Sequence, residues 1–588
     1  MKYLNRIYLG QTVDYLKKNG WKNVLNKVPE YLLTNRGYQS WRREHIPSPE
    51  ELARQKILSK KMENRPLFSI LVPAFNTDPL HLRQMVESVF EQTYGNWELC
   101  IADGSPKPSK VEEFFHDYAR EYGLTVTSSV IPEYRADSEF ESNSDSETEA
   151  DSEIPIHSFP YGSGRVLLAG IHNMGIAGNT NAALALSSGD FIVLLDHDDL
   201  LSPDALFELA RVINSNPSVD VLYTDEDMVS ADGTFYQNPN FKPEFNLDLL
   251  RSCNYITHLY AVRRTLALSV HGFAEEYDGS QDYDFILKTI EYASCVYHIP
   301  KILYHWRIHT DSVASDSDNK SYAYDSAVHA LQIHYQRSKS LAFARKDSQP
   351  GFYLTDYPLS DWSTVSVLSY HCKDILMRTL HTLSDSVYST VEFPESPEDM
   401  SGEYVLVLRH ISAVSPELIS LLLANCMRPE IAIAVPRIQR ADGKILEAGL
   451  IYNAEGQILS PFAGRDPSYP GYHRYALCQH LTSLAGPYCF MTTMENLRRN
   501  WRVNKCQNGE RKKRDLYDRM AEFCFRTLLD KKQITMVPQP LARLTEAGTL
   551  EAKSSPHRIT DQSYIQAHPV DPYYTPNFSQ NRPYRFTP

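Results

Sequence analysis

Apolar and polar positions along the first half of the chain repeat with the periods of strands and helices. The apolar runs 68–72 and 97–102 flank a segment, 80–90, in which apolar residues recur every three or four positions. Because buried strands are continuously apolar and amphipathic helices repeat about every 3.6 residues, this order predicts a strand, a helix and a second strand. Further apolar runs at 191–195 and 219–223 continue the alternation. We therefore expect an α/β domain, a sheet flanked by helices.

The polar turn that follows the run 191–195 is the strongest chemical feature of the sequence. It contains Asp196, Asp198 and Asp199, and ligands of open α/β sheets bind just beyond the carboxyl ends of strands. Carboxylates about 4 Å apart repel each other by about 4 kcal/mol per pair at an effective dielectric near 20, so the turn either splays into water or binds a cation. Oxygen ligands on a short loop suit Mg2+ or Mn2+, with phosphate oxygens completing the shell.

Other acids stand at the ends of expected strands and helices. Asp103 follows the second strand, where such folds bind a nucleotide, although capping of the next loop explains it equally well. Asp225 and Asp227 form a second acidic cluster after the run 219–223. Asp282 lies near the start of a helix, where an acid also complements the helix dipole without further function.

Acidic residues and serines dominate residues 133–158, and apolar residues are few. Such a segment buries too little surface to offset the entropy lost on ordering. We expect a disordered acidic insertion in a surface loop. Solvation alone explains it more simply than partner binding does.

The N-terminal residues 1–64 form a basic extension that we expect to be helical. An extension of this kind either lies on an anionic membrane surface or packs against the next domain. Gly10, Gly20 and Pro29 interrupt its apolar periodicity, which favours packing.

Composition narrows the class of protein. The chain has 588 residues, of which 42% are hydrophobic and 22% charged, as in ordinary globular proteins. No apolar run approaches the roughly eighteen residues of a membrane span, and the N-terminus lacks a signal-peptide pattern, so we expect a cytoplasmic protein. The nine cysteines contain no C-x-x-C pair, and the net charge of −14 argues against nucleic-acid binding.

The motifs stand in the order and spacing of family-2 glycosyltransferases with the GT-A fold, a Rossmann-like mixed sheet flanked by helices. The chain resembles the bacterial branch that builds cell-surface polysaccharide, including rhamnan and O-antigen assembly enzymes, over about residues 68–335. The segments that carry this resemblance are 69–76, 101–104, 189–199, 279–284 and 304–307.

The resemblance implies a role for each matching residue on the donor side. Pro73, Asn76 and Asp103 would line the nucleotide, with Asp103 accepting a hydrogen bond from the base. Asp196 and Asp198 match the D-x-D motif of the family. In that motif the second acid binds the divalent cation, Mn2+ or Mg2+, and the first contacts the ribose or a metal-bound water.

The resemblance also implies the remaining parts of the site. Asp282 matches the general base that acts on the acceptor hydroxyl, and His305 matches a histidine that can complete the metal shell. Thr180 stands where many relatives have Arg, so other cations must contact the diphosphate, with Arg307 and Lys242 as candidates. The residues expected near the acceptor are Asp225, Asp227, Lys242 and Trp306, with core packing as the alternative for Trp306.

The second half of the chain resembles a second, degenerate family-2 domain. After a linker at 338–358, the apolar segments 363–369 and 403–412 match the strands at 68–73 and 191–199, within a domain expected at 359–548. The acids of the first turn are missing there. Acceptor binding or an architectural role would fit such a domain, as would a metal-independent transferase. The tail 549–588 shows no periodicity and is expected to be extended.

The implied function is inverting transfer of a sugar from a nucleotide-diphosphate sugar to a glycan or lipid-linked glycan, in a protein that contacts the membrane at most peripherally. Two other classes of protein remain as alternatives. A nucleotidyltransferase also uses acidic metal turns, but it usually has a Gly-rich phosphate loop, and none is present at 73–80. A non-catalytic glycan-binding or scaffold protein would not need the acids at 198 and 282.

Overall fold

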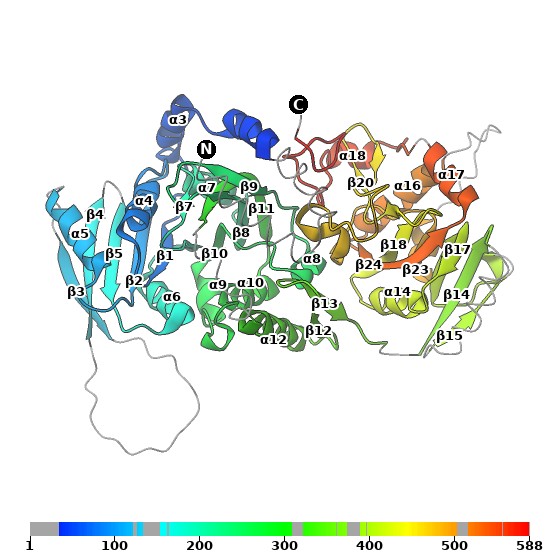
Figure 1. The fold of residues 1–588 in the computed structure, drawn as a ribbon, viewed down its shortest axis with the longest axis horizontal. Coiled ribbons are helices and arrows are strands. Elements are labelled where there is room, and N and C mark those ends of the chain that lie inside the picture. The colour runs from blue at the N-terminus through cyan, green and yellow to red at the C-terminus, as the bar shows by residue number, and fades with distance from the viewer. Residues whose placement is uncertain are drawn as a thin grey trace, which may run out of the picture. The chain divides into compact units, whose positions relative to one another are not determined.

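A computed structural model describes residues 35–121, 126–132, 153–161, 164–308, 321–359, 362–372, 389–394, 397–501, 515–555 and 557–586. The described chain divides into two compact units (Figure 1). The first contains the chain up to Lys242 together with Ile256–His334, and the second contains Pro243–Tyr255 and the chain from Tyr335 onward. The short segment Pro243–Tyr255 thus belongs to the second unit, although residues of the first precede and follow it in the sequence.

The first unit is built around one mixed sheet with the strand order β3-β4-β5-β2-β1-β6-β10-β8-β11-β7, and β9 pairs with β8. Strands β5, β2, β1 and β6 are parallel, whereas β10 is antiparallel to both of its neighbours. Every residue of β2 is buried, which explains its continuous apolar run. The expected mixed α/β architecture is confirmed. The strands are β1 (Phe68–Ala74), β2 (Trp97–Asp103), β3 (Thr127–Pro132), β4 (Glu153–Tyr161), β5 (Gly164–Gly170), β6 (Phe191–Leu194), β7 (Leu200–Leu201), β8 (Val221–Val229), β9 (Tyr236–Asn240), β10 (Tyr260–Arg263) and β11 (Val296–Arg307).

Helices pack on this sheet through apolar stripes. Helices α4, α5 and α7 join one hydrophobic cluster with alternate residues of β1, among them Ile70 and Val72, and α6 packs against β1 and β2. Helix α4 begins where Asp78 caps the backbone N–H of Leu80. The helices are α3 (Pro49–Ser59), α4 (Pro79–Phe90), α5 (Lys110–Glu121), α6 (Gly175–Leu186), α7 (Ala205–Ser215), α9 (Arg264–Ser269), α10 (Gln281–Tyr292) and α12 (Ser321–Arg337).

The described part of the N-terminal extension packs on the first unit. Residues 35–45 are helical, and the ring of Trp41 meets Phe241 edge to face at 4.8 Å. The guanidinium of Arg42 lies 3.5 Å from the ring centre of Tyr236, which is part of β9. Residues 1–34 lie outside the described residues.

Part of the expected acidic insertion is a strand. Residues 133–152 lie outside the described residues, but 153–158 begin β4. That strand forms antiparallel ladders with β3 on one side and β5 on the other, and Ile156 is buried. The expectation of disorder is therefore wrong for 153–158, because two neighbouring strands satisfy its backbone.

The second unit repeats the strand order of the first. Its sheet runs β15-β14-β16-β23-β18-β24-β17, with the same sequence of parallel and antiparallel neighbours as β2-β1-β6-β10-β8-β11-β7. The sheet and its attached strands are β14 (Ser363–Tyr370), β15 (Ser389–Glu392), β16 (Tyr404–Arg409), β17 (Ile411–Val414), β18 (Ile431–Gln439), β19 (Ile445–Glu447), β22 (His480–Leu481), β23 (Cys489–Thr493) and β24 (Gln533–Leu544). The helices after β17 are α14 (Leu418–Cys426), α15 (Met494–Asn500), α16 (Leu516–Leu529), α17 (Glu546–Ser554) and α18 (Ser563–Ala567).

A hydrogen-bonded cluster at the start of the strands is also repeated. In the first unit the Ser69 hydroxyl donates to Glu98 at 2.6 Å and accepts the backbone N–H of Gly189 at 2.9 Å. The residues that make the same contacts in the second unit are Ser366, Glu392 and Gly402. The second unit is therefore a structural repeat of the first, as the sequence suggested.

Two segments of the second half carry more structure than the sequence indicated. The expected linker contains a hairpin of β12 (Phe343–Lys346) and β13 (Tyr353–Asp356). The expected extended tail contains α18 and most of α17, and the side chains of Tyr574 and Phe578 are buried. Aromatic residues without periodicity thus pack into this unit.

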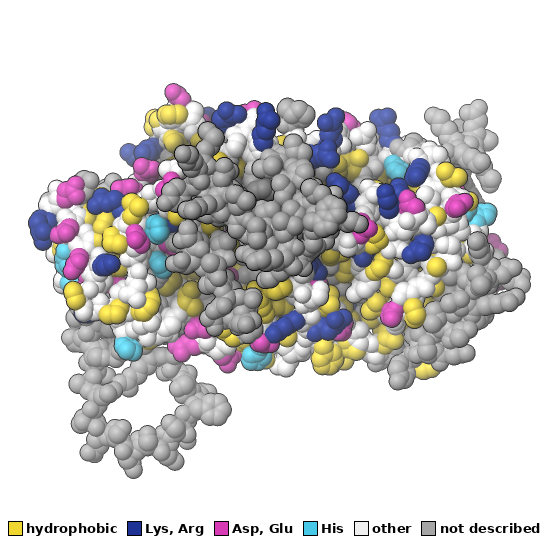
Figure 2. Space-filling model, in the orientation of Figure 1, with side chains coloured by type: hydrophobic (Ala, Val, Ile, Leu, Met, Phe, Trp, Pro, Cys, Tyr) yellow, Lys and Arg dark blue, Asp and Glu magenta, His cyan; other side chains and the backbone are white. Residues whose placement is uncertain are grey.

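Charges of both signs are interspersed over the described surface visible in Figure 2, where Lys and Arg lie among Asp and Glu. A chain with a net charge of −14 can therefore still present local cations. Among the helices that the structure describes, none combines the length and the apolarity needed to cross a bilayer.

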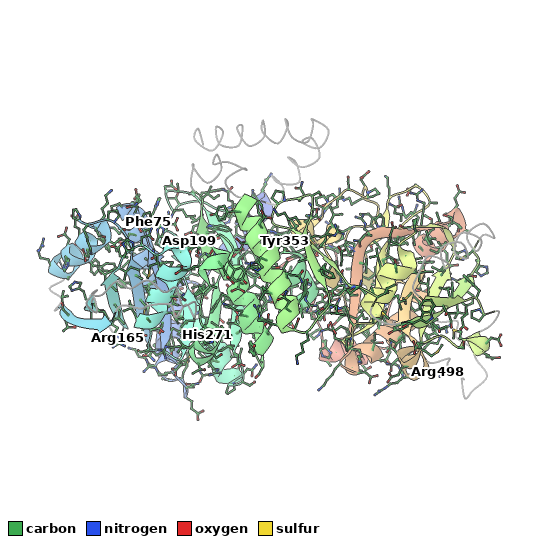
Figure 3. The ribbon with its side chains drawn as sticks, turned by 90° about the horizontal axis from the view of Figure 1, so that it is seen from below. Phe75, Arg165, Asp199, His271, Tyr353 and Arg498 are labelled. Atoms are coloured by element: carbon green, nitrogen blue, oxygen red, sulfur yellow. The ribbon has the colours of Figure 1, made fainter. Side chains whose placement is uncertain are left out.

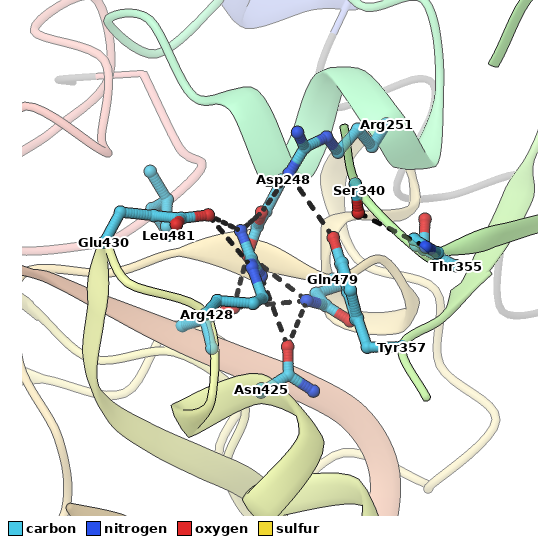
Figure 4. Close-up of polar contacts among 12 residues, drawn as sticks. Asp248, Arg251, Ser340, Thr355, Tyr357, Asn425, Arg428, Glu430, Gln479 and Leu481 are labelled. Carbon is cyan, nitrogen blue, oxygen red and sulfur yellow. Dashed lines mark hydrogen bonds and ion pairs between the residues drawn. The ribbon is translucent and has the colours of Figure 1, made fainter. Parts of the chain in front are cut away.

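A buried ion pair ties the segment Pro243–Tyr255 into the second unit (Figure 4). Asp248, on α8 (Leu247–Ser252), accepts hydrogen bonds from both terminal nitrogens of Arg428, at 2.6 and 2.9 Å. Its carboxylate also accepts from Thr535 at 2.6 Å and from Gln479 at 3.2 Å. Burial alone would raise the pKa of Asp248, but Arg428 holds it well below its usual range.

We expect Asp248→Asn to lower the free energy of unfolding by about 3–5 kcal/mol, because it leaves the buried Arg428 guanidinium with only the partly exposed Glu430 as a charged partner. Urea denaturation monitored by circular dichroism measures this change. Because the folded pKa lies below the unfolded value of about 3.9, the stabilisation is fully present above that pH and is lost as the pH falls below it. The control is Asp356→Asn, which breaks an exposed pair with Arg345 and should cost at most about 1 kcal/mol. Equal losses in both variants would contradict the anchoring role of Asp248.

Candidate active site at the carboxyl edge of the first sheet

Parallel strands bring the expected nucleotide and metal residues to one edge of the first sheet. In the register of β1 and β2, Ala74 pairs with Asp103, and β6 ends beside β1, where Leu71 pairs with Leu194. Figure 3 shows Phe75 and Asp199 at this edge, and Arg165 and His271 at the opposite one. The loops after β1, β2 and β6 thus meet where open α/β sheets bind ligands.

The acidic turn after β6 is anchored by Asp199. This carboxylate is fully buried and accepts hydrogen bonds from the Tyr304 hydroxyl at 2.6 Å and from the backbone N–H of Arg307 at 2.7 Å. Burial and the neighbouring charges of Asp196 and Asp198 raise its pKa well above the ordinary value. Asp199 therefore attaches the turn to β11, while the Asp196 side chain stays 38% exposed and Asp198 partly exposed.

Arg307 closes the other side of the turn. Its Nε donates to the carbonyl of Asp198 at 2.5 Å and its Nη1 to the carbonyl of Ala231 at 2.9 Å. Burial lowers the pKa of the guanidinium. The remaining nitrogen, Nη2, is buried without a hydrogen-bond partner among the described residues. Arg307 is only 2% exposed, so the structure uses its guanidinium to hold the acidic turn and does not expose it to a diphosphate.

His305 lies in a buried hydrogen-bond chain. Its Nε2 lies 3.0 Å from the Ser202 hydroxyl and its Nδ1 2.5 Å from Asp227. Asp227, also fully buried, accepts a further hydrogen bond from Tyr38. Both ring nitrogens are engaged, so His305 has no lone pair left for a cation, and Asp227 has no surface for an acceptor. The structure does not support the roles that the sequence suggested for these two residues.

Lys242 and Asp225 are likewise parts of the interior. The Lys242 ammonium is fully buried and donates to the carbonyls of Ile256 and His258, at 2.6 and 2.5 Å. Asp225, also fully buried, accepts the backbone N–H of Lys242 and a hydrogen bond from His298, each at 2.8 Å. Neither side chain is exposed to a diphosphate or an acceptor. The sequence suggested both roles because it did not reveal that these residues are buried.

The base candidate lies within the electrostatic range of the acidic turn. Asp282 stands in the first turn of α10. Burial raises its pKa, the positive field of His258 opposes the rise, and the charge of Asp196 adds to it. Trp306 is 43% exposed, with its ring edge-on to His258 at 5.9 Å. The structure thus brings Asp196 and Trp306 beside His258, a residue that the sequence analysis missed.

The candidate residues at the ends of β1 and β2 differ in how exposed they are. Asp103 is fully buried, with its carboxylate accepting hydrogen bonds from the backbone N–H of Ser105, at 3.0 Å, and from the Ser109 hydroxyl. Asn76 is exposed and adopts a left-handed φ of 50°, and its backbone N–H donates to the Ser105 hydroxyl at 2.9 Å. Pro73 is partly exposed. Asp103 therefore shapes the loop that would receive a nucleotide.

The acids of the turn after β6 suit a cation that is bound partly by the protein and partly by the substrate. Among the described residues, no group of three or more His, Cys, Asp or Glu side chains is arranged to hold a metal. The exposed carboxylates of Asp196 and Asp198 nevertheless offer oxygen ligands on one turn. Mg2+ and similar ions are often held by one or two carboxylates together with substrate phosphates, so this donor set is sufficient only when a diphosphate is present.

The corresponding turn of the second unit has a different chemistry. The guanidinium of Arg409 pairs with Glu551 of α17, with nitrogen–oxygen distances of 3.1 and 3.2 Å, and His410 lies 3.1 Å from the same carboxylate. A cation at this turn would meet a guanidinium in place of carboxylates. The acids Asp515 and Asp518 bind Ser555 and Thr560 of the C-terminal segment, so they hold that segment in place.

Comparison with known proteins gives the family. Glycosyl transferase family 2 matches residues 69–128 and 147–268, which include β1, β2 and the acidic turn. The chain therefore carries a glycosyl transferase family 2 domain, and the resemblance inferred from its motifs is confirmed.

The chain is also similar to individual proteins and solved structures. The chain is 29% identical over 472 residues to the uncharacterized protein y4gI of Sinorhizobium fredii, covering 72% of this chain and 47% of that protein. It is 26% identical over 472 residues to the O-antigen biosynthesis protein RfbC of Myxococcus xanthus, covering 72% and 33%. The chain thus spans less than half the length of these relatives. A Staphylococcus aureus TarS structure with UDP-GlcNAc aligns with a TM-score of 0.33 at 16% identity, covering 45% of this chain and 66% of that one.

The site geometry predicts that His305→Gln keeps metal-dependent nucleotide binding, whereas Asp198→Ala loses it. The reason is that His305 binds Ser202 and Asp227, while Asp198 offers a partly exposed carboxylate. Calorimetry with UDP, GDP and dTDP in the presence of Mn2+ measures both. We expect Asp198→Ala to weaken binding about tenfold or more, the loss of a charged contact worth at least 1.4 kcal/mol. Loss of the Mn2+ effect in His305→Gln alone would instead make the histidine a ligand.

Proposed function

We propose that the first unit transfers a sugar from a nucleoside-diphosphate sugar to a hydroxyl group of a glycan or lipid-linked glycan, with inversion at the anomeric carbon. The observation that carries the proposal is the acidic turn at the carboxyl edge of the sheet, where Asp196 and Asp198 stay partly exposed inside the segment that matches the family. Family membership supports the reaction class. An O-antigen biosynthesis protein and chondroitin synthases among the relatives support a polysaccharide product.

The reaction is a single displacement. The acceptor oxygen forms a bond to the anomeric carbon as the bond from that carbon to the diphosphate oxygen breaks. The nucleoside diphosphate leaves with the bonding electron pair, and the hydroxyl proton moves to the Asp282 carboxylate. Because burial raises the pKa of Asp282, its carboxylate is a stronger base than that of an exposed aspartate.

The acidic turn after β6 would help to compensate the charge of the leaving group. Asp198, with Asp196 nearby, would hold Mn2+ or Mg2+, and the bound cation would neutralise charge that develops on the diphosphate. Arg307 would keep the turn in place through its bond to the Asp198 carbonyl. Asn76 and Pro73 stay partly or fully exposed on the loop after β1, where the nucleoside would lie, with Asp103 fixing the neighbouring loop.

The second unit serves acceptor binding or architecture in this proposal. Its turn carries Arg409 paired to Glu551, so it offers no carboxylate pair for a cation. A metal-independent transferase in this unit is the alternative. Transfer that survives Asp198→Ala would favour that alternative.

A donor screen separates this proposal from its rivals. Thermal shift with UDP-, dTDP- and GDP-sugars in the presence of Mn2+ should show stabilisation by one nucleotide class, because binding to the folded state raises its melting temperature. Stabilisation by a nucleoside triphosphate together with a sugar phosphate would instead indicate a nucleotidyltransferase. The absence of any shift would favour a glycan-binding scaffold.

We expect Asp282→Asn to lower the transfer rate by about 10²–10⁴-fold while donor affinity stays unchanged, because the amide cannot accept the proton. Release of nucleoside diphosphate in the presence of acceptor measures the rate, and calorimetry measures donor binding. The matched control is Glu276→Gln, which neutralises an exposed carboxylate before the same helix. Near wild-type turnover in Asp282→Asn would overturn the assignment of the base.

A further inference from the structure

A guanidinium that is removed from water needs an acid nearby to offset its charge, and one buried arginine of the second unit has none. The described chain contains four deeply buried arginines. Arg251 and Arg428 lie 3.8 and 2.6 Å from the carboxylate of Asp248. Arg307 lies beside the acids of the turn after β6, whose charges act on it. The fourth, Arg437, is 6% exposed and pairs with no carboxylate among the residues that the structure describes.

The hydrogen bonds of Arg437 leave part of its guanidinium unused. Its Nη1 donates to the carbonyl of Pro467 at 2.8 Å, whereas its Nε is buried with no hydrogen-bond partner in the described chain. Burial lowers the pKa of this guanidinium to about 10, and no neighbouring acid offsets the effect. The group therefore stays charged near neutral pH. The second unit thus contains a buried positive charge that its described residues do not neutralise.

Arg437 lies where a ligand of this fold would bind. It stands two residues before the end of β18. Because β16 and β18 are both antiparallel to β23, they run in the same direction. Arg437 is therefore near the same edge of the second sheet as the turn after β16. Open α/β sheets bind ligands at this carboxyl edge.

The pairing of β18 with β24 is irregular at Arg437. On β24, the partners of the residues before and after Arg437 are Val537 and Ala542. One residue of β18 thus faces residues 538–541, a bulge of the kind that redirects side chains next to active sites. Gln539 lies in this bulge, and its side-chain oxygen is also buried without a hydrogen-bond partner among the described residues. Two polar side chains with unused atoms therefore stand on opposite strands of one bulge.

The first unit shows that the fold itself does not require such a charge. In β8 the pairing with β11 shifts after Thr224, and Asp225 follows. In β18 the pairing with β24 shifts after Pro436, and Arg437 follows. Asp225 is fully buried and is satisfied within the protein, in part by His298 at 2.8 Å. A satisfied acid at this position is thus replaced in the second unit by an unneutralised cation, which indicates a use outside the fold.

We propose that Arg437 and Gln539 form a binding site in the second unit for an acidic sugar, a ligand that carries a carboxylate or phosphate beside hydroxyl groups. A guanidinium binds carboxylate and phosphate oxygens through paired N–H donors. The unused amide oxygen of Gln539 can only accept a hydrogen bond, which a sugar hydroxyl would donate. An acidic glycan acceptor would carry these groups, but the site does not depend on the reaction proposed for the first unit.

The test compares Arg437→Met with the wild type in the full chain. The probes are D-glucuronate and D-glucose 1-phosphate, with D-glucose as the uncharged control, in EDTA and at constant ionic strength. We expect an acidic probe to raise the melting temperature of the wild type, because a ligand that binds the folded state stabilises it. In Arg437→Met, the Kd of that probe should rise about tenfold or more in calorimetry, the loss of a charge-assisted hydrogen bond. Without ligand, this variant should melt no lower than the wild type, because it removes an uncompensated buried charge.

The matched control is Arg409→Met, which removes the other guanidinium at the same edge of the second sheet. Because Glu551 already pairs with Arg409, this variant should leave the response to the acidic probes unchanged. A response to glucuronate alone would identify a carboxylate ligand, and a response to glucose 1-phosphate alone would identify a phosphate ligand. Either response supports the site.

Four results would overturn the inference. They are no thermal shift with either acidic probe, an equal shift with glucose, an unchanged Kd in a folded Arg437→Met, and an equal loss of affinity in Arg409→Met. If Arg437→Met fails to fold, Arg437→Lys decides, because lysine keeps the charge and loses the paired donors. A weaker affinity in that variant supports the site, and an unchanged affinity overturns it. Wild-type protein that transfers no sugar would overturn the proposed function and leave this inference standing.

Discussion

The buried carboxylate of Asp199 is the constraint on which the site depends. Bonds to the Tyr304 hydroxyl and to the backbone of Arg307 fix the turn after β6 to the end of β11. One acid of the turn is thereby satisfied inside the protein, and the other two stay accessible to a ligand. The same contact brings Tyr304 beneath the ring of His258 and Arg307 beside Asp198. A single buried acid therefore sets where the acids of the turn, the Arg307 guanidinium and the His258 imidazole lie relative to one another.

The structural repeat explains how one chain separates stability from chemistry. Both sheets share their strand order, and both keep the serine–glutamate–glycine cluster at the start of the strands. At the acidic turn they diverge, because Arg409 with Glu551 forms an ion pair where the first unit leaves acids exposed. An ion pair satisfied within the protein needs no external cation. The second unit thus retains the strand order of the first without the donor set that the proposed reaction requires.

Much of the fold could be predicted from the sequence, but only part of the site. Continuous apolar runs revealed β1, β2 and β6 because these strands are buried on both faces, and the adjacency of Asp196 and Asp198 revealed the turn. The sequence did not distinguish Asp199 as the anchor, because exposure depends on contacts with β11, about a hundred residues later. Lys242 and Asp225 were expected at the ligand for the same reason, and both are interior. His258 was missed because its stack on Tyr304 and its approach to Asp196 exist only in the fold.

The central claim is that only the turn of the first unit assembles a cation site, and only together with a diphosphate. The most direct measurement is the anomalous diffraction of manganese in crystals of the protein grown with Mn2+ and the nucleoside diphosphate that binds it. The account predicts one peak, at the carboxylate of Asp198 and bridged to the diphosphate, and none beside Arg409. A turn left empty at saturating nucleotide, its acids directed away from the bound diphosphate, would contradict it, as would a peak in the second unit.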